Sequence, residues 1–203
     1  MRHVAGIILC GGQSSRMGRP KCWLSFGGEL MLPRVVRLLA EVVSPIVVVG
    51  SLGQELPPLP PDVILVCDPV SGRGPLQGLV AGLTALPHGT DRTDAAYVSS
   101  CDVPFLRPAF VGRMIELLGQ SDACMPRVNG FLHPLAAVYR RSVAPVAEQL
   151  LEAGHAGPKD LCSIVRTRIL TADELIDADP DLRSLQNVNS PEDYAALMRA
   201  LAN

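Results

Sequence analysis

The feature that most constrains the fold is a regular alternation of short apolar runs with longer segments of helical periodicity. The short runs are too brief and too uniformly apolar for amphipathic helices, which predicts buried strands at residues 4–9, 46–49, 63–67, 95–99, 123–125 and 135–139. Between them, apolar residues recur every three or four positions, which predicts helices at 32–43, 76–86, 108–118, 142–153, 159–165 and 191–201. This order predicts an α/β fold with a mainly parallel, doubly wound, Rossmann-like sheet.

Length and composition favour one domain over residues 1–203, because this length suffices for one substantial core and is short for two. Hydrophobic residues make up 48% of the chain and aromatic residues only 4%, as expected for an aliphatic core around a sheet covered on both faces. The formal net charge of −2 provides no overall field to attract nucleic acid or an anionic membrane. The acidic stretch 173–181 is interpreted as a solvated surface loop or short helix.

Cysteine usage indicates a reducing compartment. The cysteines form no C-x-x-C pair and have no histidine at metal-ligand spacing, so we expect small buried thiols and no zinc site; they are Cys10, Cys22, Cys67, Cys101, Cys124 and Cys162. The first residues are typical of neither a signal peptide nor a membrane span. We therefore expect a cytoplasmic protein without nucleic-acid or membrane partners.

The first apolar run ends in a glycine-rich loop, residues 10–21, which also carries Arg16 and Lys21. Glycine lets backbone N–H groups approach a polyphosphate closely, so the loop indicates nucleotide binding, with an ordinary glycine turn as the alternative. The Walker A pattern fails because Gly18 is followed by Arg-Pro-Lys-Cys, and the dinucleotide fingerprint fails because the first two glycines are adjacent. The loop belongs to neither of these two types.

Reactive side chains follow three of the expected strands. Lys21 follows the first, Asp68 the third and Asp102 the fourth. Ligands of open parallel sheets bind at the carboxyl ends of strands, so we expect these side chains to converge on one rim. Asp102 is placed to hold Mg²⁺, a hard cation that takes oxygen ligands, whereas capping of the helix near residue 108 is the alternative role.

A second glycine-rich segment, residues 72–79, leads into the helix expected at 76–86. We interpret Gly74 and Gly78 as positions where a ligand approaches the start of this helix, with close packing as the alternative. For Gly82, packing is the favoured interpretation.

The motifs of the chain, in their order and approximate spacing, resemble those of the molybdenum cofactor guanylyltransferases, a family of nucleotidyltransferases. The resemblance runs from the first strand to the last helix and rests on Leu9-Cys10-Gly11-Gly12-Gln13-Ser14-Ser15-Arg16-Met17-Gly18, Lys21, Asp68, Gly74-Pro75-Leu76, Gly78, Cys101-Asp102-Val103-Pro104, His133-Pro134 and Asn187-Val188-Asn189-Ser190-Pro191. It implies a Mg²⁺-dependent enzyme of nucleotidyltransferase fold. Such an enzyme transfers GMP from GTP to the terminal phosphate of molybdopterin or Mo-molybdopterin and releases pyrophosphate.

The resemblance also implies roles for single residues. With the loop arguments above, nucleotide binding is expected at Leu9, Cys10, Gly11, Gly12, Lys21, Asp68, Gly74, Gly78 and Asp102. Catalysis is expected from Arg16, Lys21 and Asp102, with Asp102 also ligating Mg²⁺. Weaker candidates on the pterin side are His133, Lys159, Asn187 and Asn189. The two asparagines either face the pterin or stabilise the closing turn, and His133 either contacts substrate or bonds within the core.

Three departures from the family pattern and three rival functions accompany the resemblance. Cys10 replaces the usual alanine, Gly50 stands where asparagine is frequent, and Lys159 takes the place of an expected arginine in a longer glycine-rich stretch. The rivals are a molybdopterin cytidylyltransferase, a sugar-1-phosphate nucleotidyltransferase and a catalytically silent nucleotide sensor. The adjacent glycines of the loop favour guanine over cytosine. Proteins that deliver or receive the cofactor are expected as transient partners.

Overall fold

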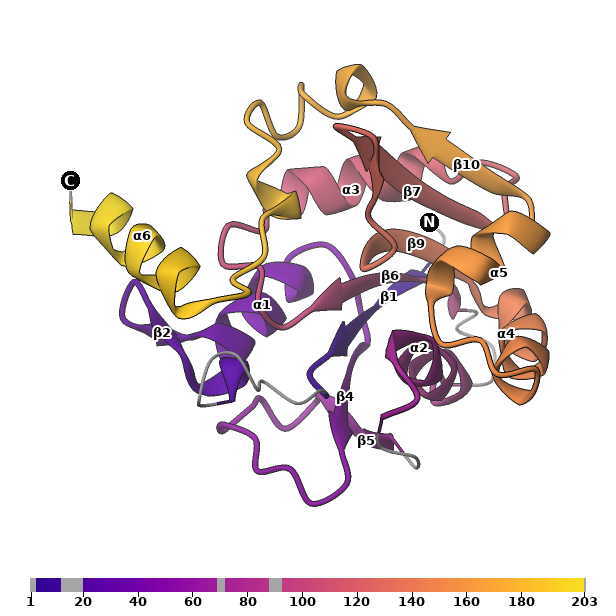
Figure 1. Ribbon diagram of the computed structural model, residues 1–203, viewed down its shortest axis with the longest axis horizontal. Helices are drawn as coiled ribbons and strands as arrows, with labels where there is room; N and C mark the ends of the chain where they lie inside the picture. The colour runs from indigo at the N-terminus through magenta and orange to yellow at the C-terminus, as the bar shows by residue number, and fades with distance from the viewer. Residues whose placement is uncertain (1–2, 12–19, 69–71, 88–92, 203) are drawn as a thin grey trace.

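The computed structural model describes residues 3–11, 20–68, 72–87 and 93–202. At its centre lies an eight-stranded sheet in the order β10-β7-β9-β6-β1-β4-β5, with the short β8 paired to β7 (Figure 1). The strands are β1 (His3–Leu9), β4 (Ile46–Ser51), β5 (Ile64–Asp68), β6 (Thr93–Ser100), β7 (Ala123–Val128), β8 (Phe131–Leu132), β9 (Ala136–Arg140) and β10 (Thr167–Leu170). Every apolar run that the sequence predicts to be a strand is one.

The sheet is mostly parallel. Strands β6, β1, β4 and β5 run parallel to one another, and so do β7 and β10. Among the described strands of this sheet, only β9 and the short β8 are antiparallel to the strands they pair with. The prediction of a mainly parallel α/β sheet is confirmed.

Helices cover both faces of the sheet, as a doubly wound fold requires. Helices α1 (Met31–Ala40) and α3 (Pro108–Leu117) pack on one face, and α2 (Pro75–Thr84), α4 (Ala144–Glu152) and α5 (Pro158–Ile164) pack on the other. Side chains of β1 alternate between the two cores: Ile8 joins the first, and Ile7 and Leu9 join the second. This alternation explains why the strand reads as a continuous apolar run.

Two tight hairpins were missed by the sequence analysis. Asn129 and Gly130 connect β7 to β8 with φ of 51° and 80°. Gly27 and Gly28 connect β2 (Ser25–Phe26) to β3 (Glu29–Leu30) with φ of 60° and 84°. Positive φ at both central residues is the requirement of a two-residue hairpin turn, which Asn-Gly and Gly-Gly meet at little steric cost.

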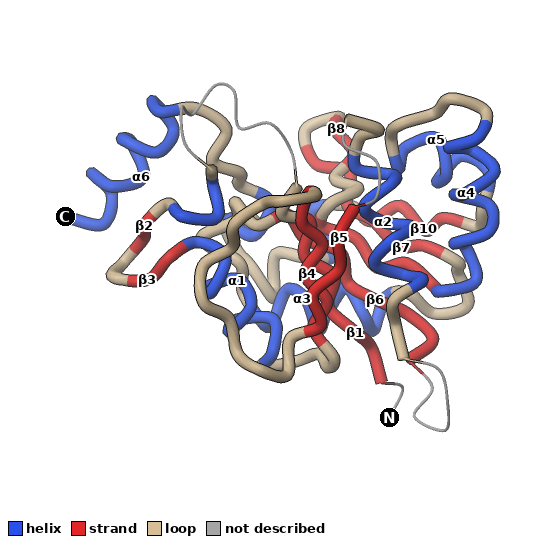
Figure 2. The backbone as a smooth tube through the Cα atoms, turned by 90° about the horizontal axis from the view of Figure 1, so that it is seen from below, coloured by secondary structure: helices blue, strands red, loops and turns tan. Residues whose placement is uncertain are grey.

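The last helix, α6 (Pro191–Ala202), lies beside the β2–β3 hairpin at the end of the molecule opposite α4 and α5 (Figures 1 and 2). The hydroxyl of Tyr194 donates to the carbonyl oxygen of Ser25 at 2.5 Å. The first turn of α6 is capped, because the Ser190 hydroxyl accepts the N–H of Asp193 at 3.1 Å. These contacts fix the segment just before α6 close to the segment that carries Lys21.

The acidic stretch 173–181 is mostly the surface segment that the sequence predicts, and it starts within the short 3₁₀ helix Ala172–Glu174, but one of its carboxylates is not solvated. Asp179 is fully buried, and its carboxylate accepts the backbone N–H of Ser184 at 2.7 Å and lies 3.2 Å from the guanidinium of Arg107. A buried carboxylate is retained only with such partners. Among the described residues, no helix is both long and apolar enough to cross a membrane.

Candidate active site

Four polar side chains from three distant segments meet at the carboxyl edge of the sheet. Lys21 begins a short 3₁₀ helix, Lys21–Trp23, Asp102 follows β6, and Asn187 and Asn189 precede α6. The ammonium of Lys21 donates to Asp102 Oδ2 at 2.5 Å and to Asn189 Oδ1 at 3.0 Å. The amide of Asn187 donates to Asp102 Oδ1 at 2.8 Å. We call these four residues the strand-end network.

The network surrounds a buried carboxylate. Asp102 is only 5% exposed, and both of its oxygens accept hydrogen bonds. Removing a carboxylate from water is costly unless a cation and hydrogen-bond donors replace the water. Lys21 supplies the cation and Asn187 the neutral donor. The convergence predicted from the strand ends is therefore confirmed for Lys21 and Asp102, which form an ion pair.

The backbone places Asp102 accurately at this edge. The carbonyl of Leu9 at the end of β1 accepts the N–H of Cys101 at 3.1 Å, which extends the β1–β6 pairing past the last strand residue. The carbonyl of Asp102 itself accepts the N–H of Val188 at 3.0 Å. Asn187 also donates to the hydroxyl of Ser100 at 2.8 Å. The end of β1 and the segment before α6 thus hold Asp102 from two sides.

The described part of the glycine-rich loop lies at the same edge. The N–H of Cys10 donates to the carbonyl of Val49 at 2.8 Å. A Cβ added to Gly11 would lie 2.9 Å from the hydroxyl oxygen of Ser51, so a side chain at this position would require a shift. Gly12 and Arg16 lie outside the described residues.

Gln54 was missed by the sequence analysis. Its amide donates to the carbonyl of Cys10 at 3.1 Å, and its Oε1 accepts the N–H of Ser51 at 2.9 Å. A Cβ at Gly50 would meet this same Oε1 at 3.6 Å. Gln54 therefore supplies an amide in the space beside Gly50. Nothing in the local sequence pattern signals this contact.

Asp68 lies on the same edge but outside the network. It ends β5 and is aligned with Ser51 of β4. Neighbouring strands are about 4.8 Å apart, so β5 lies about 14 Å from β6 across three strand spacings. That span suits a ligand that extends across several strand ends.

Gly74 and Gly78 have close neighbours within the protein. Gly74 has a φ of 79°, and an added Cβ would lie 2.7 Å from the carbonyl oxygen of Ala156. Added Cβ atoms at Gly78 and Gly82 would lie 3.2 Å from Leu9 and 2.6 Å from Ile7. Packing explains glycine at all three positions, as expected for Gly82. Ligand roles for Gly74 and Gly78 stay predictions.

His133 and Lys159 form a second group at this edge. His133 precedes β9, which begins opposite Ser99 near the end of β6. Burial, and then the positive charge of Lys159, hold the pKa of His133 below its usual range. The backbone N–H of His133 donates to the carbonyl of Pro126 at 3.0 Å. The two candidates are near enough to interact electrostatically.

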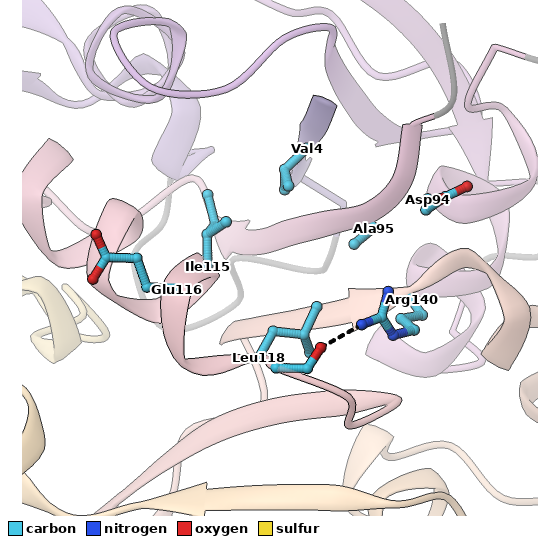
Figure 3. A pocket seen from close by; sticks show the side chains of 8 residues that line it. Val4, Asp94, Ala95, Ile115, Glu116, Leu118 and Arg140 are labelled. Carbon is cyan, nitrogen blue, oxygen red and sulfur yellow. Dashed lines mark hydrogen bonds between the residues drawn. The ribbon is translucent and has the colours of Figure 1, made fainter. Parts of the chain in front are cut away.

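The opposite, amino edge of the sheet carries a pocket of about 200 Å³ (Figure 3). Val4 and Ala95 contribute to its apolar wall, and Arg140 lies at one side. The Arg140 guanidinium donates to the carbonyls of Gly119 at 2.7 Å and Ser121 at 2.8 Å. Because these hydrogen bonds are to backbone carbonyls, Arg140 stabilises the fold at the amino edge. We therefore take the carboxyl edge, with its strand-end network, as the candidate active site.

Two features at the carboxyl edge of the sheet define the class of protein. A glycine-rich loop follows β1, and a carboxylate paired with a lysine follows β6. Together they are features of a nucleotidyltransferase. Comparison with known proteins narrows the class. The chain belongs to the MobA-like NTP transferase domain family, whose model matches residues 6–169.

Several relatives are similar over nearly their whole length. The chain is 33% identical to a probable molybdenum cofactor guanylyltransferase of Pelotomaculum thermopropionicum, covering 95% of this chain and 91% of that protein. It is also 33% identical to the molybdenum cofactor guanylyltransferase of Desulfosudis oleivorans, covering 95% and 93%. The crystal structure of molybdopterin-guanine dinucleotide biosynthesis protein A from Archaeoglobus fulgidus shares the fold, with a TM-score of 0.80 at 20% identity over 98% of this chain and 99% of that one.

Proposed function

We propose that this protein transfers GMP from GTP to the terminal phosphate of molybdopterin or Mo-molybdopterin, forming molybdopterin guanine dinucleotide and pyrophosphate. The observation that carries the proposal is the ion pair of Lys21 with buried Asp102 at the strand ends. Relatives named as molybdenum cofactor guanylyltransferases supply the choice of substrates. The adjacent Gly11 and Gly12 favour guanine, as argued from the sequence.

The strand-end network has the chemistry of a divalent cation site. The Lys21 ammonium lies between Asp102 Oδ2 and Asn189 Oδ1, so two oxygens already face a cation. Within the described ranges no group of three or more His, Cys, Asp or Glu side chains forms a metal cluster. Mg²⁺ commonly takes one or two carboxylates and completes its coordination with water and substrate phosphates, so a single buried carboxylate fits it. When bound, Mg²⁺ would neutralise charge on the triphosphate.

The residues of the network divide the work. Asp102 would hold the metal, and Lys21 would offset negative charge that develops on the α-phosphate and on the departing pyrophosphate. Arg16, which lies outside the described residues, is proposed to share that role. Asn187 and Asn189 orient the carboxylate and the ammonium through the hydrogen bonds described above.

The remaining candidates surround the two substrates. The Asp68 carboxylate is able to accept the N1 and N2 hydrogens of guanine, which adenine does not offer in the same arrangement. Lys159 offers a cation, and His133 a neutral imidazole, to the pterin phosphate. That phosphate is already partly ionised at neutral pH, so its in-line attack on the α-phosphorus needs little help from a protein base. Positioning and charge neutralisation then account for catalysis.

The direct test incubates purified protein and Mg²⁺ with molybdopterin and either GTP or CTP. A separate reaction offers a sugar 1-phosphate and nucleotide. Mass spectrometry of the pterin product and pyrophosphate release are measured together. Guanylylated pterin from GTP, and little product from CTP, is the expected result. Preferential cytidylylation or transfer to the sugar phosphate would replace the proposal with the matching rival.

We also propose a cytoplasmic location and transient contacts with proteins that deliver or receive the cofactor, which fractionation and cross-linking can test.

A further inference from the structure

The turn at the end of β4, residues 51–55, contacts both ends of the glycine-rich loop. It is bonded to Cys10 at the start of the loop and to the 3₁₀ helix Lys21–Trp23 at the end of the loop. Gln54 makes most of these contacts, and its side chain is half-buried. One amide therefore lies between the two chain segments that the loop connects.

The turn itself fixes the direction of the Gln54 side chain. The backbone N–H of Gln54 donates to the carbonyl of Ser51 at 3.1 Å, and the N–H of Ser51 donates to Gln54 Oε1 at 2.9 Å. Gly53, the third residue of the turn, has a φ of 71°, which glycine adopts at little steric cost. Because Oε1 faces a donor, the Nε2 group of the same planar amide faces an acceptor on its other side.

That acceptor belongs to the peptide between Cys10 and Gly11. Gln54 Nε2 donates to the carbonyl of Cys10 at 3.1 Å. A trans peptide is planar and its carbonyl and N–H point in opposite directions, so this bond directs the N–H of Gly11 away from Gln54. Among the described residues, no acceptor is bonded to the N–H of Gly11. This N–H is therefore available to a nucleotide.

The same turn holds the helix that carries Lys21. Gln54 Nε2 lies 3.7 Å from the sulfur of Cys22, which is buried. The indole N–H of Trp23 donates to the backbone carbonyl of Glu55 at 3.2 Å. The helix is thus attached to the turn at two points, and Lys21 is its first residue.

We propose that Gln54 is a positioning residue for the nucleotide: it directs the Gly11 N–H toward the nucleotide and holds the Lys21 helix beside it. The inference rests on the proposed function, which includes nucleotide binding at Gly11 and Lys21. Gln54 acts through the peptide after Cys10 rather than by touching the nucleotide, because its Oε1 and one Nε2 hydrogen are already bonded within the protein. Its Nε2 also lies 3.7 Å from the sulfurs of Cys10 and Cys22.

The first test measures GTP binding to the full chain without the pterin. Isothermal titration calorimetry with GTP and Mg²⁺ compares the wild type with Gln54→Met, which keeps the length of the side chain and has neither amide group. We expect the dissociation constant to rise about tenfold, the effect of losing one hydrogen bond that orients a binding group. Gln120→Met changes an exposed glutamine between α3 and β7 and is the matched control, which should bind GTP as the wild type does.

Gln54→Glu tests the direction of the hydrogen bond through its pH dependence. The carboxylate still accepts the N–H of Ser51, but its second oxygen faces the carbonyl of Cys10 and is repelled by it. The protonated acid donates its O–H to that carbonyl, as the amide does. GTP binding should therefore be weakest relative to the wild type near about pH 8 and should recover as pH falls toward about 5, where the carboxyl takes up a proton. Gln54→Met has no titrating group there and should show no such recovery.

In the complete reaction, KM for GTP should rise in Gln54→Met, whereas KM for molybdopterin should stay unchanged. A folded Gln54→Met that binds GTP as tightly as the wild type would overturn the inference, even if its free energy of unfolding is lower. If Gln54→Met does not fold, Gln54→Glu decides, and weak binding without recovery at low pH would overturn the inference.

The binding series separates this inference from the proposed function. A wild type that binds GTP about tenfold more tightly than Gln54→Met but transfers no GMP would support the role of Gln54 and reject only the proposed function. Normal GMP transfer with unchanged GTP binding in Gln54→Met would reject only the role of Gln54. A wild type that does not bind GTP would overturn both.

Discussion

The two edges of the central sheet use charged side chains in different ways. At the amino edge, Arg140 donates to the carbonyls of Gly119 and Ser121, and Arg141 donates to that of Pro87 at 3.1 Å. These bonds connect side chains to the backbone and complete the fold. At the carboxyl edge, the four residues of the strand-end network bond mainly to one another.

The difference shows at which edge of the sheet a charged side chain can bind a substrate. A guanidinium committed to backbone carbonyls stabilises the fold, and its loss leaves unsatisfied acceptors. A lysine paired with a carboxylate can exchange that partner for a phosphate or a metal-bound ligand. The network also joins residues 81 and 168 positions apart in sequence, so it forms only when the distant segments have folded together. Substitutions at the two edges should therefore affect different quantities.

Asp102→Asn should have the largest effect on activity. The variant keeps the shape of the side chain and removes the charge, so we expect kcat for guanylyl transfer to fall on the order of 10³-fold. Steady-state kinetics with GTP and Mg²⁺ measures the loss, and circular dichroism checks that the fold persists. Near-normal turnover in a folded variant would remove the metal role from this carboxylate.

Lys21→Met should have the second largest effect on activity. We expect kcat/KM to fall by about 100-fold because one charge-stabilising donor is lost. Lys21→Arg keeps the charge in a wider, planar group and should have intermediate activity. The same kinetic assay compares both variants. If both matched the wild-type chain, Lys21 would not face the phosphates.

Arg140→Met should reverse the pattern at the amino edge. Loss of two bonds from a charged donor to carbonyls is expected to lower the free energy of unfolding by about 2 kcal/mol and to leave kcat unchanged. Urea denaturation measures the stability. A variant that kept its stability but lost turnover would contradict the division between the edges.

Asn187→Ala should lower kcat by about tenfold, because residues that orient a metal-ligating carboxylate have effects of this size. The exposed neighbour Gln186, changed to alanine, is the matched control and should behave as the wild type. Equal activity of the two variants would leave Asn187 with a purely structural role.

The smallest effect concerns pH. Because burial and Lys159 lower the pKa of His133 in the folded state, the unfolded chain binds this proton first as pH falls. Stability contributed by neutral His133 is present above the unfolded pKa of about 6.5 and is lost as pH falls from there toward the lower folded pKa. The unfolding free energy of His133→Gln should therefore decrease less steeply below about pH 6.5 than that of the wild type. Identical slopes would show that the imidazole titrates alike in both states.

Much of the fold was readable from local pattern, because β1, β4 and β6 are buried enough to appear as plain apolar runs. The short strand Thr167–Leu170 was not, since its residues alternate in exposure over only four positions. The hairpin turn at Asn129 and Gly130 carried a usable signal that was overlooked.

The site was predicted only in part. That Lys21 and Asp102 meet follows from a general rule about strand ends, and the structure confirms that contact. The bonds that Asn187, Asn189 and Gln54 make to this edge depend on long-range folding, which no local pattern encodes. Ligand contacts of the predicted site residues, and a single domain over residues 1–203, stay predictions.

The most direct measurement is the anomalous diffraction of Mn²⁺ in crystals grown with a non-hydrolysable GTP analogue. Mn²⁺ prefers the same oxygen ligands as Mg²⁺ and is visible at its own absorption edge. The account predicts one strong peak bonded to the Asp102 carboxylate and to the nucleotide phosphates, with Lys21 Nζ on the triphosphate and the guanine toward Asp68. A nucleotide and metal bound elsewhere on the molecule, with Lys21 still paired to Asp102, would contradict it.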